Sequence, residues 1–496
     1  MKKIFSIMLA LMLLLTLCSC NESTTNNNLE ATSAPTNTTT NDNTLDSTQP
    51  PLSSTETPNV STSTPNTTTN TTTNIPTTKP ETTTNAPTTK PTTTANTNPT
   101  TAPNGSTNDS SAIYDSNGIE YILSDGYLWA SSYGTCTQKN ITIPNRVNGI
   151  NVIGVYSSAF IANSTIESVT FSEGITTIGE GAFLACNRLK TVNFPSTIKR
   201  LELSAFSDCA ITTMTLPNGL TYIGKGCFQG LKIKKLSIPA SVQTIEKNAF
   251  QKSDLEEVII LGKTTLGSSI FKQCTKLTSV TLPEGITDIP SQAFFECSSL
   301  ATMNIPGSVV NVGTNAFYGC NSLTLSQLTV KGNISLNSFS NLNIKNLDIY
   351  TNVTQCAFLS ASIQNVTIHE GVTSIGNDVF ERAYIGSITL PSTLTSVGSY
   401  AFYGTTINKV VFTSAVTLGH SAFKGSTIKE ITLPAGSILK NYVFCDCSSL
   451  ETIHYGGTKQ QWLAMIQIPN YSYNYSDYKE LNNATIICSD GTIFPK

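Results

Sequence analysis

Charge is scarce in this sequence. Of its 496 residues only 12% are Asp, Glu, Lys or Arg, and the formal net charge at pH 7 is −3. Nucleic-acid binding requires a concentrated basic surface, and so does attachment to an anionic membrane by charge alone. The composition therefore predicts no nucleic-acid partner and no charge-driven membrane partner.

Patterns of catalytic and metal-binding residues are also missing. The chain has three histidines, His369, His420 and His454, and it has neither an HExxH nor a GxSxG motif. No CxxC pair is accompanied by the second CxxC or the histidine that a zinc site needs. Because His420 lies shortly before a repeated Ala-Phe pair, we interpret it as a solvated turn residue. We expect no enzymatic activity, no metal and no cofactor.

Residues 1–20 have the three parts of an export signal. Two lysines are followed by an apolar stretch, Ile7 to Leu15, and then by small residues. The end of this segment, Leu17-Cys18-Ser19-Cys20, resembles a bacterial lipobox. The resemblance implies cleavage before Cys20, a lipid on its sulfur, and a mature protein held on the bacterial cell surface by a membrane anchor.

Residues 21–111 consist mainly of Thr, Asn, Pro and Ser and contain no aromatic residue. Such a composition has too little apolar surface to offset the entropy lost on ordering. We therefore predict a disordered tether between the lipid anchor and the rest of the chain.

An Ala-Phe pair, or a close variant of it, recurs fourteen times in the rest of the chain. Its phenylalanines are Phe160, Phe183, Phe206, Phe228, Phe250, Phe271, Phe294, Phe317, Phe339, Phe358, Phe380, Phe402, Phe423 and Phe444. The spacing is 21 to 23 residues except for the 19 between Phe339 and Phe358. A period in the low twenties with LxxLxL-like apolar positions is typical of a leucine-rich-repeat solenoid.

One unit, LTSVTLPEGITDIPSQAFFECSSL at residues 277–300, shows what each position does. Val280 and Leu282 alternate with Thr281, which predicts a short strand with the first two side chains inward. Pro283 ends this strand because it cannot donate to a ladder, and Phe294 crosses the core. Seven of the fourteen copies have glycine four residues before the phenylalanine, which we interpret as a turn with positive φ. These glycines are Gly179, Gly224, Gly267, Gly313, Gly376, Gly398 and Gly419.

The unit resembles the BspA-like, or treponemal-type, leucine-rich repeat, whose copies read I-P-x-x-V-x-x-I-G-x-x-A-F-x-x-C. The resemblance covers residues 141–455 and implies a surface protein that binds ligands on host or neighbouring cells. The fold class predicted is a mainly-β repeat solenoid, a right-handed leucine-rich-repeat superhelix of about 14 coils, because fourteen copies are present.

Both ends of such a stack need a cap, since the last coil otherwise exposes its core. Residues 112–140 contain a predicted hairpin from Tyr121 to Gly134, with Trp129 over the first coil. Residues 456–496 begin with Thr458 and Gln461, the pattern of a capping box before a short helix. The later tyrosines are interpreted as loop packing: Tyr471, Tyr473, Tyr475 and Tyr478.

Six of the thirteen cysteines share one position, three residues after the phenylalanine: Cys186, Cys209, Cys274, Cys297, Cys320 and Cys447. Other copies have Ala or Ser there, so the position requires a small side chain rather than sulfur. We predict buried free thiols, although neighbouring coils are close enough for disulfides.

The outward position of each strand carries mostly small polar side chains, which we predict to form a binding face. Its polar members are Thr170, Asn193, Thr215, Ser237, Thr281, Asn304, Asp348, Thr367, Thr389 and Thr432. The predicted function is adhesion to, or binding of, an extracellular protein or glycan. A polysaccharide-active β-solenoid enzyme and a purely structural envelope protein remain as alternatives. The stretch from Ser326 to Gln355 loses the repeat pattern and is either a degenerate coil that changes curvature or a binding notch.

Overall fold

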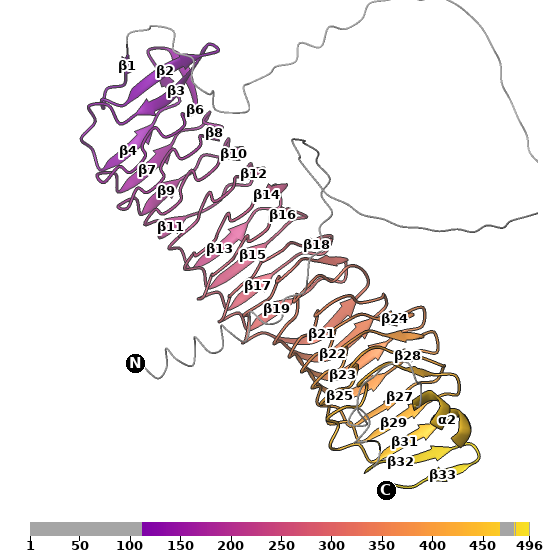
Figure 1. The fold of residues 1–496 in the computed structure, drawn as a ribbon. Helices are drawn as coiled ribbons and strands as arrows, with labels where there is room; N and C mark the ends of the chain where they lie inside the picture. The colour runs from indigo at the N-terminus through magenta and orange to yellow at the C-terminus, as the bar shows by residue number, and fades with distance from the viewer. Residues whose placement is uncertain (1–111, 467–480, 482, 496) are drawn as a thin grey trace, which may run out of the picture. The chain divides into compact units, whose positions relative to one another are not determined.

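The computed structural model describes residues 112–466, 481 and 483–495, which form a stack of short strands (Figure 1). The segment with Cys20, the tether at 21–111 and the tyrosines between 471 and 478 lie outside the described residues. No helix in the described part of the chain is long and apolar enough to span a membrane.

An antiparallel hairpin lies at the N-terminal end of the stack. It consists of β2 (Glu120–Ser124) and β3 (Tyr127–Ser132), and β1 (Ile113–Tyr114) pairs with the outer side of β2. Trp129 lies in β3 and is completely buried. The predicted hairpin is therefore present. Leu128 and Ala130 of β3 belong to the core, whereas the ring of Trp129 between them lies against Gly154.

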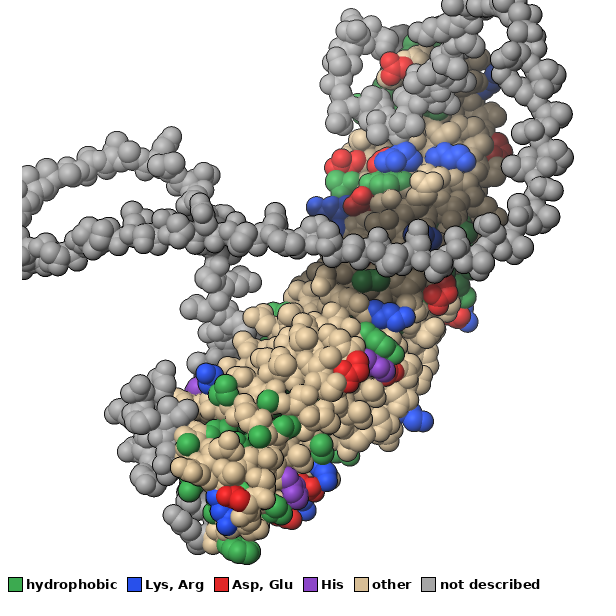
Figure 2. Space-filling model, turned by 90° about the vertical axis from the view of Figure 1, so that its right-hand side faces the viewer, with side chains coloured by type: hydrophobic (Ala, Val, Ile, Leu, Met, Phe, Trp, Pro, Cys, Tyr) green, Lys and Arg blue, Asp and Glu red, His purple; other side chains and the backbone are tan. Residues whose placement is uncertain are grey.

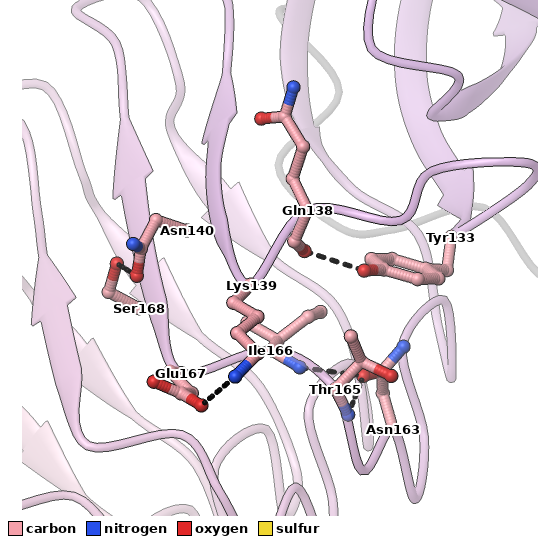
Figure 3. A network of polar contacts seen from close by, with 9 residues as sticks. All are labelled: Tyr133, Gln138, Lys139, Asn140, Asn163, Thr165, Ile166, Glu167 and Ser168. Atoms are coloured by element: carbon pink, nitrogen blue, oxygen red, sulfur yellow. Dashed lines mark hydrogen bonds and ion pairs between the residues drawn. The ribbon is translucent and has the colours of Figure 1, made fainter.

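Polar contacts join this cap to the coil that follows it (Figure 3). Lys139 Nζ lies 3.1 Å from Oε1 of Glu167, and the hydroxyl of Ser168 donates to Oδ1 of Asn140 at 2.7 Å. Asn163 Oδ1 accepts hydrogen bonds from two following backbone amides at 2.8 and 2.9 Å. These side chains thus fix the turn at Asn163 and the register of the two strands that begin at Asn140 and Ser168.

The longer strand of each coil pairs in parallel with its neighbours, and together these strands make the front of the solenoid in four sheets. The first two sheets contain β4 (Asn140–Ile143), β7 (Ser168–Phe171), β9 (Thr191–Asn193) and β11 (Thr213–Met214), then β13 (Lys235–Ile238), β15 (Glu257–Ile260), β17 (Ser279–Thr281) and β19 (Thr302–Asn304). The third contains β21 (Thr324–Val330), β22 (Asn343–Ile349), β23 (Ser362–Ile368) and β25 (Tyr384–Thr389). The fourth contains β27 (Lys409–Val411), β29 (Glu430–Leu433), β31 (Thr452–Tyr455), β32 (Thr485–Cys488) and the antiparallel β33 (Gly491–Ile493).

A second, shorter strand in most coils forms the back ladder. From the hairpin onward it runs through β6 (Ile150–Val155), with β5 (Arg146–Val147) at its side, then β8 (Thr177–Ile178), β10 (Arg200–Leu201), β12 (Tyr222–Ile223), β14 (Thr244–Ile245) and β16 (Thr265–Leu266). It continues as the pair β18 (Asp288–Ile289) and β20 (Asn311–Val312), and later as β24 (Ser374–Ile375), β26 (Ser396–Val397), β28 (Thr417–Leu418) and β30 (Ile438–Leu439).

The fourteen repeated phenylalanines form one continuous stack through the core. Each ring is stacked on the ring of the next coil, from 4.9 Å between the centroids of Phe160 and Phe183 to 6.0 Å between Phe423 and Phe444. All fourteen side chains are buried. Offset stacking adds to the burial of apolar area, so this column supplies much of the attraction between coils.

The seven glycines that precede the phenylalanines have a different role from the predicted one. None of them has a positive φ. A Cβ added to Gly267 would lie 2.3 Å from the backbone nitrogen of Lys247, and one added to Gly313 would lie 2.3 Å from that of Ser291. The glycines therefore allow two backbones to approach closely. The positive φ angles fall two residues later, chiefly on Ser, Asn, Asp and Gln, so the predicted position was wrong.

Several polar occupants of the cysteine position also make a hydrogen bond to the preceding coil. Cys297 Sγ donates to the backbone oxygen of Phe271 in the preceding coil at 3.1 Å, and Thr405 Oγ1 donates to that of Phe380 at 2.7 Å. These occupants combine small size with a hydrogen-bond donor, whereas Ala361 and Ala383 occupy the position without a donor. Buried free thiols are confirmed for Cys186, Cys209, Cys274, Cys297 and Cys320.

The irregular stretch between Ser326 and Gln355 lengthens the front strands. Here β21, β22 and β23 have seven residues each, whereas no strand from β7 to β19 has more than four. The back ladder shrinks to isolated bridges, such as Val353 with Ile375, because the second apolar phrase of the repeat is lost. The core continues unchanged, with the rings of Phe339 and Phe358 5.6 Å apart.

A short helix, α2 (Lys459–Ile466), follows the last repeat and begins with the predicted capping box. The backbone amide of Thr458 donates to Oε1 of Gln461 at 2.8 Å, and that of Gln461 donates to Oγ1 of Thr458 at 3.2 Å. Trp462 is buried and lies 5.4 Å from the ring of Tyr455 on β31. The helix therefore packs an indole against the last coil.

Candidate functional site

The outward side chains predicted as a binding face occupy matching positions on neighbouring strands. We call the outward side of the four front sheets the front face. Register pairs Thr170 with Asn193, then aligns Ser237, Thr281 and Asn304, then Asp348, Thr367 and Thr389, and brings Thr432 beside Val411 and His454. Thr215 directly follows β11. All of these side chains are exposed or half-buried, so a partner in contact with one column meets several coils.

Most of the charge on the front face is neutralised within pairs that bridge neighbouring coils. Lys235 Nζ lies 2.7 Å from Oε2 of Glu257, and Lys409 Nζ lies 2.7 Å from Oε1 of Glu430. The face drawn in Figure 2 is mostly neither charged nor hydrophobic, with acidic and basic side chains in small groups. Such a surface recognises a partner through many neutral polar contacts rather than by long-range attraction.

A hollow of about 430 Å³ opens in the front face where the first two sheets meet. The strands β11 and β13 belong to different sheets, whereas on the back β12 and β14 remain paired. The two coils therefore separate on the front only. The hollow is lined by Thr215 and Ser237 and by apolar side chains that include Ile259 and Leu261, of which Leu261 is 56% exposed. An apolar group of a partner fits here between hydrogen-bonding neighbours.

The third sheet carries the densest polar network on the front face. Asp348 Oδ1 lies 2.8 Å from Nε2 of His369 on the next coil, and Gln327 Nε2 on the preceding coil donates to Asp348 Oδ2 at 2.5 Å. Three successive coils are thus joined through one carboxylate. The predicted face residue Asp348 is therefore not an isolated charge.

An amide row runs beside this network. Asn365 Nδ2 donates to Oδ1 of Asn346 at 2.9 Å, and the hydroxyl of Ser387 donates to Oδ1 of Asn365 at 2.9 Å. Each amide has more than one donor and acceptor, so the row keeps groups directed at solvent while its rotamers are fixed. Ordered side chains lose less entropy when a ligand binds.

Tyr350 adds an aromatic surface to the same sheet. Its ring stacks on His369 with centroids 3.9 Å apart, and the side chain is 48% exposed. Our sequence reasoning missed Tyr350, His369 and the amide row. Comparing the sequences of successive coils at every outward strand position, and not at one position only, would have revealed these residues.

The structure also gathers aromatic side chains beside the Ala-Phe turns, on the surface that we call the turn side. His420 lies between Tyr400 and Tyr442, with ring centroids 5.5 and 5.3 Å away, and its Nδ1 is 2.9 Å from the hydroxyl of Ser421. His420 therefore lies in a turn, as predicted, but neighbouring rings cover part of its side chain. It is half-buried among rings.

Two carboxyl groups with a raised pKa lie on the turn side. Burial raises the pKa of both Glu381 and Asp378, and Oε1 of Glu381 lies 3.4 Å from Nη1 of Arg382. Within the described ranges, no three His, Cys, Asp or Glu side chains are grouped so that they would hold a metal ion.

Solved structures with this architecture are leucine-rich-repeat proteins. One from Bacteroides ovatus is 20% identical over 75% of this chain and 99% of that chain, with a TM-score of 0.57. A leucine rich cell surface protein from Faecalibacterium prausnitzii is 21% identical over 72% and 98% of the two chains, with a TM-score of 0.37. A search of curated proteins gives no match. The similarity to the Bacteroides ovatus protein shows the fold of this chain.

The described residues therefore form a mainly-β leucine-rich-repeat solenoid of about 15 turns, close to the predicted 14, and contain one short helix near their C-terminal end. The BspA type leucine rich repeat region matches residues 153–265, 262–357 and 351–478, in six copies. The chain belongs to this family, which is consistent with a role in protein binding.

Proposed function

We propose that this protein is a lipid-anchored surface protein that mediates adhesion by binding an extracellular protein or glycan through its front face. The observation that carries the proposal is the alignment of exposed, neutral polar side chains from coil to coil, as in Thr281 opposite Asn304. Each contact with such a side chain is weak. Many contacts along successive coils, or many copies on one cell, give avidity.

The sequence before residue 112 supports a location on the cell surface. Residues 1–20 have the parts of an export signal and end at Cys20, and residues 21–111 have the composition of a tether. Metabolic labelling with a palmitate analogue tests the anchor. We expect the parent to incorporate the label and a Cys20→Ala variant to lose it; equal labelling of the two would refute an anchor at Cys20.

Binding is tested with the purified full-length chain on immobilised extracellular-matrix proteins, mucins and glycans. We expect saturable binding to one of them. The variant Asn365→Arg places a bulky charge in the amide row of the front face and should weaken that binding about tenfold or more. The matched control is Asn341→Arg on the turn side, where Arg382 occupies the equivalent position two coils later.

The competing functions give different results in the same preparation. A depolymerisation assay on the glycans tests the enzymatic alternative, and turnover that disappears in Glu381→Gln would replace the adhesion proposal by a polysaccharide-active enzyme. Binding that Asn365→Arg and Asn341→Arg weaken equally would remove the front face from the proposal. If the protein shows neither binding nor turnover, a structural envelope protein is the favoured function.

A further inference from the structure

Two tyrosines stand where the repeat otherwise has small or short polar residues. The residue two positions before each repeated phenylalanine has a positive φ in every coil. The other occupants are Ser158, Gly181, Ser204, Gly226, Asn248, Ser269, Gln292, Asn315, Asn337, Cys356, Asp378 and Ser421. Tyr400 and Tyr442 occupy this position with φ angles of 57° and 61°. Positive φ is unfavourable for a bulky side chain, and residues held in this way concentrate at functional sites.

Packing of the core does not require these rings. The phenylalanine stack already fills the interior beside them, with Phe402 and Phe423 4.9 Å apart. Tyr400 is 39% exposed. Asparagine serves the same backbone position at Asn248, Asn315 and Asn337 and is among the residues that adopt positive φ most readily. We therefore infer that the two tyrosines serve the exposed surface of the molecule and not the packing of its core.

The rings on the turn side form a connected group on three successive coils, which we call the tyrosine ridge: Tyr400, Tyr403, His420 and Tyr442. Neighbouring rings are tilted rather than coplanar. The planes of Tyr400 and His420 meet at 47°, and those of His420 and Tyr442 meet at 57°. Tilted rings leave notches between them, whereas a flat sugar ribbon stacks best on coplanar rings.

The spacing of the ridge matches an extended proline-rich helix. Tyr400 and Tyr442 are two coils apart, and coils at the inter-strand distance place them about 9.6 Å apart along the solenoid. A polyproline II helix repeats every three residues, which is about 9.3 Å. Proline rings at every third position therefore meet equivalent tyrosines. Aromatic-lined surfaces are a general means of docking such segments.

The polar groups of the ridge fit the same ligand. A polyproline II segment has no internal hydrogen bonds, so its carbonyl oxygens can accept from the hydroxyls of Tyr400 and Tyr403 and from a histidine N–H. The nearby cations already have acidic partners: Lys424 Nζ lies 3.7 Å from Oδ2 of Asp446, and Arg382 Nη1 lies 3.4 Å from Oε1 of Glu381. The ligand is therefore uncharged where it meets the ridge.

We propose that the tyrosine ridge is a second binding site, separate from the front face, and that it docks a proline-rich segment of a partner protein in the polyproline II conformation.

The test uses the full-length chain and a fluorescently labelled nine-residue polyproline peptide, with binding followed by anisotropy. We expect saturable binding by the parent. The double variant Tyr400→Asn/Tyr442→Asn should bind at least about tenfold more weakly, since it removes both ring contacts. The control is Tyr384→Asn, which removes a tyrosine that is 51% exposed on β25 outside the ridge and should bind like the parent.

Thermal unfolding separates a binding role from a structural one. Because asparagine suits positive φ, the double variant should melt at the same temperature as the parent or higher, so its loss of binding cannot be attributed to misfolding. A lower melting temperature would show that the rings stabilise the fold and would overturn the argument from strain. Absence of saturable peptide binding, or equal binding by the double variant, would also overturn the proposal. So would cellohexaose binding that the double variant loses while the peptide fails to bind, since the ridge would then be a glycan site.

Discussion

Nε2 of His369 lies 2.8 Å from Oδ1 of Asp348, and the two side chains belong to neighbouring coils of the front face. The same carboxylate accepts a hydrogen bond from Gln327 on the preceding coil. Side-chain bonds therefore reinforce the backbone ladder where the front strands are longest. Asp348 thus links three successive coils of the third sheet through side chains.

We predict that Asp348→Ala lowers the free energy of unfolding by about 0.5 to 1.5 kcal/mol, because two hydrogen bonds at a half-buried position are lost. Urea denaturation measures the change, and hydrogen exchange should locate it in β22 and β23. Glu451→Ala is the control, since that carboxylate is exposed and its nearest ion pair, with Lys429, is 3.7 Å long. Equal losses in both variants would contradict a special role for the network.

The buried thiols give a second prediction. Cys297→Ser should lower the free energy of unfolding by only about 1 kcal/mol, because the hydroxyl retains the Phe271 carbonyl as an acceptor. Phe294→Ala should lower it by about 3 to 5 kcal/mol through a cavity in the ring stack. Equilibrium denaturation compares the two. A loss for Cys297→Ser as large as that for Phe294→Ala would disprove the proposed role of the carbonyl.

Thiol titration checks the same cysteines in the folded state. Burial raises the pKa of Cys274 to about 11 and that of Cys320 to about 12. Both thiols are therefore protonated at pH 8 and should react with a thiol reagent only after local opening or in denaturant. Titration of fewer than half of the mature thiols in denaturant would instead indicate disulfides.

Two exposed glutamates predict a dependence of stability on acid. The backbone amides of Ser196 and Ser392 donate to Glu173 and Glu370 of the preceding coils at 2.9 and 2.8 Å, and these bonds hold the pKa of each carboxyl below its usual 4.5. A lowered pKa in the folded state stabilises the protein above the unfolded value. That contribution disappears as the pH falls through the folded value.

Glu370→Gln should therefore flatten the fall in melting temperature between neutral pH and pH values below 4.5. The control is Glu284→Gln, which changes the same position of another repeat, where Gly307 replaces the serine of the next coil. Thermal melts across this pH range make the comparison. An equal change in slope for both variants would show that the serine bonds are not the cause.

The C-terminal cap predicts a local effect. Thr458→Ala removes one half of the capping box and should lower the free energy of unfolding of the last coils by about 1 kcal/mol, and Trp462→Ala should lower it by about 3 to 5. Repeat arrays are stabilised by contacts between neighbours, so hydrogen exchange should rise near Phe444 and remain unchanged near Phe160. Uniform loosening from one end to the other would contradict this view.

The core was predictable from the sequence because its signal is periodic. The phenylalanines recur at a nearly fixed spacing, and inward positions such as Val280 alternate with outward ones such as Thr281, so each copy confirms the others. The network of Asp348 and His369 was not predictable in this way. It depends on side chains that occur once, in coils where the pattern is interrupted, and on a register between strands that the repeat length alone does not reveal.

The glycine four residues before the repeated phenylalanine shows a different limit of prediction from sequence. Sequence alone does not distinguish a glycine needed for positive φ from one needed for close approach, because both leave the same residue at a fixed point of the repeat. At Gly267 the structure identifies the second reason, since the backbone of Lys247 occupies the space that a side chain would need. This distinction can be tested by adding a single methyl group.

Gly267→Ala should lower the free energy of unfolding by about 1 to 3 kcal/mol, because the new Cβ meets backbone atoms that have no alternative rotamer. Gly307→Ala is the matched control: it lies on the surface, with no atom within 4 Å of an added Cβ, and its φ is not in the positive range. That substitution should leave stability unchanged or raise it slightly, since alanine restricts the unfolded chain. Urea denaturation of the two variants gives the comparison. If Gly267→Ala were as stable as Gly307→Ala, the approach of the coils would tolerate a methyl group, and another explanation for the repeated glycine would be needed.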